Sequence, residues 1–330
     1  MSRSGASGPL LVERGERDRR PSAAAAALQA GLGLALLLAG WATSLAGVEP
    51  VRRYWFDLVW SGYVVAGDAV VWRRAGRSLL HGGARRVPAL LALSAAFWWG
   101  FEVANWRLDN WRYLGEVTDA PWALVLSKTL SFSLVLPALV TSRDLLGSLL
   151  RPPDPPPLRL PGWTAAAMVA LGLASAPLLY RFPDQTFPLL WAAPLLLLDG
   201  LAALRGRPSA LALVRAGRAG PVLLVALAGL VTGVLWELWN VGAQPHWAYR
   251  VPYLGGWPVF EMPLLGYLGY PPFALACDAL VRAVTGGAGW LGDPREPAGA
   301  PGGSGGRLKE PGAVAPRTTR GSSPTQSVTD

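Results

Sequence analysis

Ligands for metals and disulfides are scarce in this chain. Its 330 residues include one cysteine and two histidines. A single cysteine excludes a disulfide framework and a cysteine-based zinc site, and two histidines leave little for a histidine-rich metal site. The sequence also lacks a Walker lysine loop, a glycine-rich dinucleotide fingerprint and a nucleophile elbow. We therefore expect no metal, and any cofactor stays unknown.

Charged residues are also scarce in this chain. Charged residues make up 15% of the chain and hydrophobic residues 52%, whereas soluble globular chains carry about 25% charged residues. This shortfall predicts an all-α fold, a polytopic bundle of membrane helices. The net charge of +9 raises the alternative of nucleic-acid binding, but the arginines fall in separate clusters between apolar stretches. The expected partner is the lipid bilayer and not a nucleic acid.

Eight apolar segments come near the ~20 residues needed to cross a bilayer. The connections on one side hold 23 of the 30 basic residues and those on the other side hold 6. The positive-inside rule then places both termini in the cytoplasm, and we expect a multi-pass protein of the cell membrane, the inner membrane of a bacterium. The predicted spans cover residues 23–46, 54–72, 88–104, 121–141, 162–180, 187–204, 219–240 and 257–284.

These spans divide the chain into five parts, because its two ends and one connection differ from the rest in composition. Both ends are rich in polar residues and glycine or arginine, and the middle connection is rich in proline. We predict a basic cytoplasmic tail (1–22), a first four-span repeat (23–150), a Pro-rich cytoplasmic linker (151–161), a second four-span repeat (162–284) and a disordered cytoplasmic tail (285–330).

The two repeats share ordered landmarks at offsets of 131 to 136 residues. Because four spans is an even number, both repeats enter the membrane from the same face, which predicts a parallel repeat with a pseudo-twofold axis along the membrane normal. The alternative is chance similarity among Leu, Ala and Trp. The matched pairs are Trp60–Asp68 with Trp191–Asp199, Glu102–Asn105 with Glu237–Asn240, Trp111–Tyr113 with Trp247–Tyr249, and Pro137–Asp144 with Pro271–Asp278.

Most of the 16 tryptophans fall near the predicted non-cytoplasmic ends of the spans. One reading is an aromatic belt at the membrane interface. The other is a cap made by the Trp-Tyr loops 105–120 and 241–256, which would close a site or stack on a ligand. The sequence leaves both open.

Ionisable residues within spans are expensive and therefore candidate functional residues. We expect Asp68, Asp199 and Asp278, which have arginines nearby in the sequence, to be ion-paired anchors. A second group lies near the outer span ends: Glu102, Glu237 and Glu261 are expected to surround Lys128 as the catalytic residues, with Asn105 and Asn240 as hydrogen-bond partners. Glu261 is the expected partner of Lys128 and Glu102 the next choice. The alternative is a polar clamp that holds the repeats together.

The last span is irregular, since three prolines and two glycines fall between Pro263 and Pro272. Prolines and glycines at that density should break a helix, and a broken helix at membrane depth persists only beside protein or a water-filled cavity. We expect Tyr267 and Tyr270 to line that cavity. The full set of predicted substrate-binding residues is Asn105, Asn240, Trp111, Tyr113, Trp247, Tyr249, Tyr267 and Tyr270.

Residues 236–280 contain aromatic, acidic and proline residues in a characteristic order: Trp236, Trp247, Tyr249, Glu261, Pro263, Tyr270 and Pro272. In this order they resemble the small membrane-embedded carotenoid (lycopene) cyclase domains. The resemblance implies proton-initiated chemistry on an isoprenoid, with Glu261 as the acid. The run from Phe260 to Tyr270 also looks like one found in uncharacterised bacterial multi-pass membrane proteins, which implies no activity.

Three functions remain open at this stage. The first is a membrane enzyme that modifies a lipid or isoprenoid by acid–base chemistry in an aromatic-capped cavity at the level of the outer leaflet. The second is a transporter of a lipid or small molecule, for which parallel repeats and a broken helix are typical. The third is a scaffold or assembly protein without catalysis. The oligomeric state is not encoded in any pattern found here.

Overall fold

The computed structural model describes residues 21–49, 51–116, 120–241, 243–253, 256–287 and 289–290. The two predicted tails, 1–22 and 285–330, lie almost entirely outside these residues. The described part is mostly helical. Its helices are α1 (Ala23–Leu45), α2 (Trp55–Ala75), α3 (Arg86–Leu108), α4 (Pro121–Ser133), α5 (Val135–Leu149), α6 (Thr164–Arg181), α7 (Pro183–Thr186), α8 (Leu189–Leu204), α9 (Ala210–Arg215), α10 (Gly220–Asn240) and α11 (Tyr270–Thr285).

Short elements of other kinds join these helices. Two segments are 3-10 helices, in which the backbone is wound more tightly, and four are strands of two to four residues. The short elements are η1 (Val51–Tyr54), η2 (Leu264–Gly269), β1 (Trp111–Leu114), β2 (His246–Tyr249), β3 (Pro258–Val259) and β4 (Met262–Pro263).

The predicted helical class is confirmed, and six helical segments of the described residues are long and apolar enough to cross a membrane. They correspond to six of the eight predicted spans. The other two predicted spans differ for identifiable reasons: α2 carries Asp57, Asp68, Arg73 and Arg74 over its 21 residues, and α8 is apolar but only 16 residues long. The six segments are Ala23–Leu45, Arg86–Leu108, Pro121–Leu149, Thr164–Arg181, Gly220–Asn240 and Leu264–Thr285.

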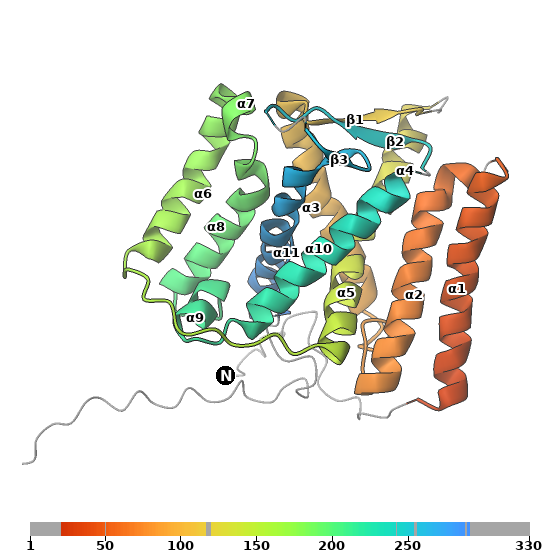
Figure 1. The fold of residues 1–330 in the computed structure, drawn as a ribbon, viewed down its shortest axis with the longest axis horizontal. Coiled ribbons are helices and arrows are strands. Elements are labelled where there is room, and N and C mark those ends of the chain that lie inside the picture. The colour runs from red at the N-terminus through yellow and green to blue at the C-terminus, as the bar shows by residue number, and fades with distance from the viewer. Residues whose placement is uncertain are drawn as a thin grey trace, which may run out of the picture. The chain divides into compact units, whose positions relative to one another are not determined.

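Two helical hairpins flank a central group of helices. Figure 1 shows α1 and α2 on one side, α6 and α8 on the other, and α3, α5, α10 and α11 between them. Each hairpin contains a close helix approach at a glycine. A Cβ atom on Gly33 would lie 2.7 Å from the carbonyl oxygen of Gly62, and one on Gly172 would lie 2.8 Å from the backbone nitrogen of Leu197. Small residues at such contacts let helix backbones pack closely in a membrane.

The fourth predicted span is also broken, which the sequence analysis did not predict. The break separates α4 from α5 at Leu134. Pro137 lies in the first turn of α5, where it has no N–H for the carbonyl of Ser133 and its ring crowds that carbonyl. Ser94 of α3 satisfies backbone groups at the break: its Oγ donates to the carbonyl oxygen of Phe132 (2.6 Å) and accepts from the N–H of Leu136 (3.0 Å).

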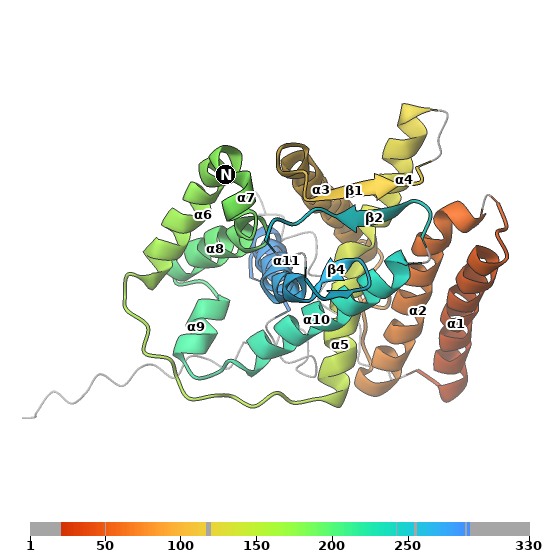
Figure 2. The same ribbon diagram turned by 45° about the horizontal axis from the view of Figure 1, so that its top comes forward.

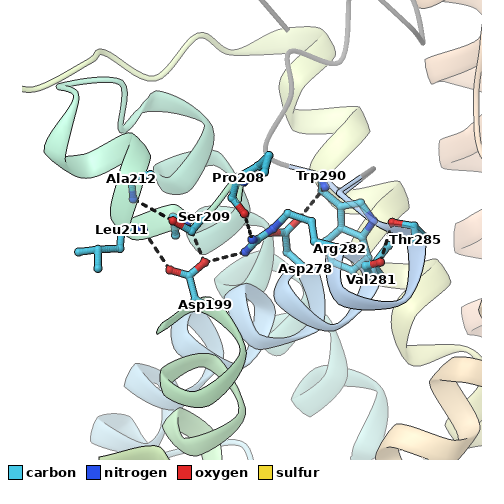
Figure 3. A network of polar contacts seen from close by, with 11 residues as sticks. Asp199, Pro208, Ser209, Leu211, Ala212, Asp278, Val281, Arg282, Thr285 and Trp290 are labelled. Carbon is cyan, nitrogen blue, oxygen red and sulfur yellow. Dashed lines mark hydrogen bonds and ion pairs between the residues drawn. The ribbon is translucent and has the colours of Figure 1, made fainter. Parts of the chain in front are cut away.

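An ion-pair network surrounds Arg282 in the last turns of α11 (Figure 3). Arg282 donates from Nε to Asp278 (2.7 Å) and from Nη2 to Asp199 (2.8 Å). Asp199 also accepts the backbone N–H groups of Ala210 and Leu211, at the start of α9. The expected ion-paired anchors are therefore confirmed for Asp199 and Asp278.

Asp68 differs from the other two anchors. Its carboxylate accepts from the Ser78 hydroxyl (2.8 Å) and the Leu80 N–H (3.0 Å) and lies 3.3 Å from Nδ1 of His81. These contacts hold the loop that follows α2, and Nε2 of Gln29 on α1 also donates to the Asp68 carboxylate (2.9 Å).

Candidate functional site

The two Trp-x-Tyr sequences pair with each other as a two-stranded antiparallel ribbon, β1–β2. Trp111 lies opposite Tyr249 and Tyr113 lies opposite Trp247. Figure 2 shows this ribbon at the end of the bundle where α3 and α10 finish. All four aromatic residues line one cavity beneath the ribbon. This arrangement is that of a cap over a site.

Glu102, near the end of α3, binds aromatic donors. Its Oε1 accepts from Trp98 Nε1 (3.2 Å), Trp111 Nε1 (3.1 Å) and the Tyr113 hydroxyl (2.8 Å). The residue is only 6% exposed. Burial raises the pKa of Tyr113 well above its usual range, and the nearby negative charge of Glu102 adds to this shift. Tyr113 therefore acts as a hydrogen-bond donor to the carboxylate.

Glu237, near the end of α10, has a related but different set of donors. Its Oε1 accepts from the hydroxyls of Tyr249 (2.6 Å) and Tyr270 (2.5 Å), and Trp247 Nε1 donates to the Tyr249 hydroxyl (2.8 Å). The second carboxylate oxygen, Oε2, is buried and has no hydrogen-bond partner among the described residues. Burial raises the pKa of Tyr249 well above its usual range, with Glu237 as a further cause.

The two predicted asparagines hold the ribbon and do not join a carboxylate cluster. Asn240 donates to the carbonyl oxygen of Trp247 (2.7 Å) and accepts from its N–H (2.8 Å). Asn105 donates to the carbonyl oxygen of Trp111 (2.8 Å) and accepts from the N–H groups of Asn110 and Trp111. Each asparagine therefore sets the position of one strand relative to the helix before it.

Lys128 has a different partner from the predicted one. Its Nζ lies 2.7 Å from Glu116 and 4.1 Å from the centre of the Tyr113 ring. The expected pairing with Glu261, or next with Glu102, is wrong. Glu261 is exposed in the turn between β3 and β4, because the chain forms a hairpin there and not the predicted helix. Lys128 is reached instead by the segment that follows β1.

The cavity beneath the ribbon has a volume of about 540 Å³. Its walls are mainly aromatic and aliphatic. Of the predicted site residues, those that line it are Lys128, Trp111, Tyr113, Trp247, Tyr249 and Tyr270, whereas Glu102, Glu237, Glu261, Asn105, Asn240 and Tyr267 lie outside the lining. The Tyr267 hydroxyl donates to the carbonyl oxygen of Val259 (3.0 Å), so it holds the β3–β4 hairpin.

Several polar residues of the cavity were missed by the sequence analysis. Asp57 of α2 is 7% exposed, lines the cavity and accepts a hydrogen bond from the Ser131 hydroxyl (2.7 Å). Ser127 and Arg53 line the same region. The available signal was an acidic residue inside a predicted span, which is a candidate functional residue by default.

Aromatic rings of neighbouring helices pack against one another around the cavity, and Trp191 and Trp236 also line it. Trp60 of α2 packs on Trp236 of α10, with ring centres 5.6 Å apart. Trp191 of α8 stacks on Phe101 of α3, with ring centres 5.4 Å apart. The hairpins α1–α2 and α6–α8 are thereby each joined to a central helix from the other half of the chain.

The described residues contain no group of three or more His, Cys, Asp or Glu that could hold a metal ion. No protein-family model, curated protein or solved structure matches the chain. The resemblance to carotenoid cyclase domains therefore stays a prediction.

Proposed function

We propose that this chain is an integral membrane protein that binds a lipid or isoprenoid beneath the β1–β2 ribbon and modifies it by acid–base chemistry. The observation that carries the proposal is the cavity of about 540 Å³, lined mainly by aromatic and aliphatic side chains with a few polar groups. Small-molecule sites have this size and composition. Its place at the predicted outer ends of the spans puts it at the level of the outer leaflet.

Tyrosine hydroxyls are the groups best placed to exchange a proton with such a ligand. Tyr249 and Tyr270 line the cavity, and both donate to Glu237. Tyr113 lines it and donates to Glu102. The two glutamates thus act through tyrosines, as positioning residues. Aromatic walls would stabilise a cation formed on an isoprenoid.

The proposal includes eight spans with both termini in the cytoplasm of a bacterium. We assign α2 and α8 as the two spans beyond the six apolar ones, because each packs along a neighbouring apolar helix through the close approach at Gly33 or Gly172. The distribution of 23 basic residues against 6 supports the orientation.

The proposal also includes two parallel four-span repeats. Matched contacts support them: Glu102 and Glu237 each accept from the tyrosine of a Trp-x-Tyr strand. The antiparallel register pairs the tryptophan of each strand with the tyrosine of the other. That pattern is expected when a twofold axis relates two copies of one element.

A strain that lacks the gene tests the function. We expect its lipid extract to lose a product and accumulate the precursor, and the wild-type gene to restore the product. A Tyr270→Phe variant should restore little product, because it removes the hydroxyl between the cavity and Glu237. Tyr267→Phe is the matched control: it lies three residues away and outside the cavity lining, so it should restore the product. An unchanged lipid profile in the deletion strain would contradict the proposal.

A transporter is the second candidate, and the broken helices favour it. Both the α4–α5 and the η2–α11 segments are interrupted at membrane depth, as in many transporter sites. In that case the deletion strain should contain the same lipids, with one of them redistributed between the two leaflets.

A further inference from the structure

One wall of the cavity is polar. Asp57 from the first turn of α2 and Lys128 and Ser131 from α4 line it together, and the Ser131 hydroxyl donates to Asp57. This wall belongs entirely to the first half of the chain. Burying such groups beside an empty apolar space is costly, so a ligand with its own polar group is the natural partner.

The corresponding wall of the second half is apolar. The offset of 131 residues that relates Trp60 to Trp191 takes Asp57 to Pro188. The sequence offset of 134 residues that relates Pro137 to Pro271 takes Lys128 to Met262 and Ser131 to Leu265, although Lys128 and Ser131 lie in α4 and Met262 and Leu265 lie in β4 and η2. Pro188, Met262 and Leu265 all line the same cavity. The two halves therefore line one cavity with residues of different polarity.

The charges at the polar wall are balanced. Among the described residues that line the cavity, the charged side chains are Arg53, Asp57 and Lys128. Glu116 lies 2.7 Å from Lys128 and neutralises its charge. This leaves Arg53 as the cation and Asp57 as the anion of the lining. A phosphate would have to approach the carboxylate of Asp57. An uncharged hydroxyl can instead donate to Asp57 and accept from Lys128.

We propose that the cavity binds a lipid with an uncharged, hydroxyl-bearing head group. The head group contacts Asp57, Lys128 and Ser131, and the apolar chain lies against Met262 and Leu265. Leu265 is 58% exposed while lining the cavity, so a long chain can leave there toward the bilayer. This proposal rests on the proposed function, since it names the class of ligand for the same site.

Competition among three lipids of similar chain length tests it. The purified full chain in detergent is incubated with equal amounts of monoolein, oleoyl lysophosphatidic acid and octadecene, and native mass spectrometry measures the bound species. We expect monoolein to be retained at least about tenfold over either competitor, a difference of about 1.4 kcal/mol.

Variants of the wall separate the contributions. Asp57→Asn keeps an acceptor for Ser131 and removes one negative charge, so binding of lysophosphatidic acid should rise about tenfold relative to monoolein. Lys128→Met, which removes the cation, should abolish the preference for monoolein over octadecene. Ser133→Ala is the control, because Ser133 lies on the same helix outside the cavity lining, and it should keep the wild-type order. The melting temperature of each variant checks that it is folded.

Four outcomes would overturn the proposal. Wild-type preference for lysophosphatidic acid, or a folded Asp57→Asn variant with an unchanged order, would contradict the uncharged head group. Equal binding of all three lipids would refute the polar contact but leave the lipid-binding cavity intact. Binding of none of them would contradict both this inference and the proposed function.

Discussion

Glu102 and Glu237 lie outside the cavity lining and contact it through the side chains that line it. Each carboxylate is buried and gathers hydroxyl or indole donors from the ribbon. A buried carboxylate is costly unless hydrogen bonds stabilise it. The tyrosines that supply those bonds line the cavity, so the carboxylates fix the positions of hydroxyl groups in its wall.

A titration tests this arrangement at single residues. Because the folded-state pKa of Tyr113 and Tyr249 lies well above the usual value, their ionisation is coupled to unfolding, and the stability they contribute is lost as the pH rises. We expect Tyr249→Phe to leave the tyrosinate absorbance of the folded protein at about pH 11 unchanged. The same change should lower the absorbance of the protein unfolded in dodecyl sulfate at that pH. A loss of absorbance in the folded state would contradict the buried hydrogen bond to Glu237.

At the scale of the element, α1 and α2 approach each other closely at Gly33. A Cβ atom on Gly33 would overlap the backbone nitrogen of Ala66 and the carbonyl oxygen of Gly62, neither of which can move without shifting α2. Gly31, two residues earlier on the same helix, has no atom within 4 Å of its Cβ position. The two glycines therefore differ in packing while sharing the same helix.

Alanine substitutions should separate these two glycines. Gly33→Ala should lower the melting temperature in detergent, with a cost of about 1–3 kcal/mol for overpacking. Gly31→Ala should leave the melting temperature unchanged or raise it, because alanine is favoured over glycine within a helix by roughly 0.5–1 kcal/mol. Equal effects of the two variants would show that the close approach at Gly33 does not hold the hairpin.

The break between α4 and α5 depends on Ser94 of a neighbouring helix. Ser94→Ala removes the donor to the Phe132 carbonyl and the acceptor for the Leu136 N–H, both buried. We expect a loss of about 1–3 kcal/mol of stability, measured by thermal unfolding in detergent. Ser133→Ala is the control, since its hydroxyl donates within its own helix to the Leu130 carbonyl. A stability loss for Ser133→Ala as large as that for Ser94→Ala would contradict this role.

The site belongs to the whole molecule, because each half of the chain contributes different groups to it. The ribbon joins β1 of the first half to β2 of the second, and Thr232 of α10 donates to Ser142 of α5 (2.8 Å) near the middle of the bundle. Neither half encloses the cavity alone. The first half supplies Asp57, Lys128 and Ser131 to the lining, and the second half supplies Pro188, Met262 and Leu265.

Reporter fusions test the topology of the whole chain. The proposed eight spans require fusions after residues 50, 85, 115 and 215 to read outside, inside, outside and inside. The fusion after residue 85 is the informative one, since it reports whether the polar helix α2 crosses the membrane. An outside signal there would mean that α2 does not cross the membrane, so the number of spans would fall and the orientation of every later span would be reversed.

The sequence by itself determined the helical class, the positions of most helices and the two Trp-x-Tyr motifs that pair in the ribbon. These features depend on local composition and periodicity, which the bilayer enforces over each span. The Trp-x-Tyr motifs were found in this way, and four of their residues line the cavity. The break in the last span was predicted from its prolines for the same local reason.

Only the tertiary structure decided which side chains meet. Lys128 pairs with Glu116 and not with Glu261, because the segment after β1 comes close to it whereas Glu261 lies in an exposed hairpin turn. Asp57 and Ser131 are 74 residues apart in the chain, yet they share a hydrogen bond at the cavity wall. Contacts of this kind depend on how separate helices pack and where their helical turns are interrupted, and no local pattern in the chain encodes either.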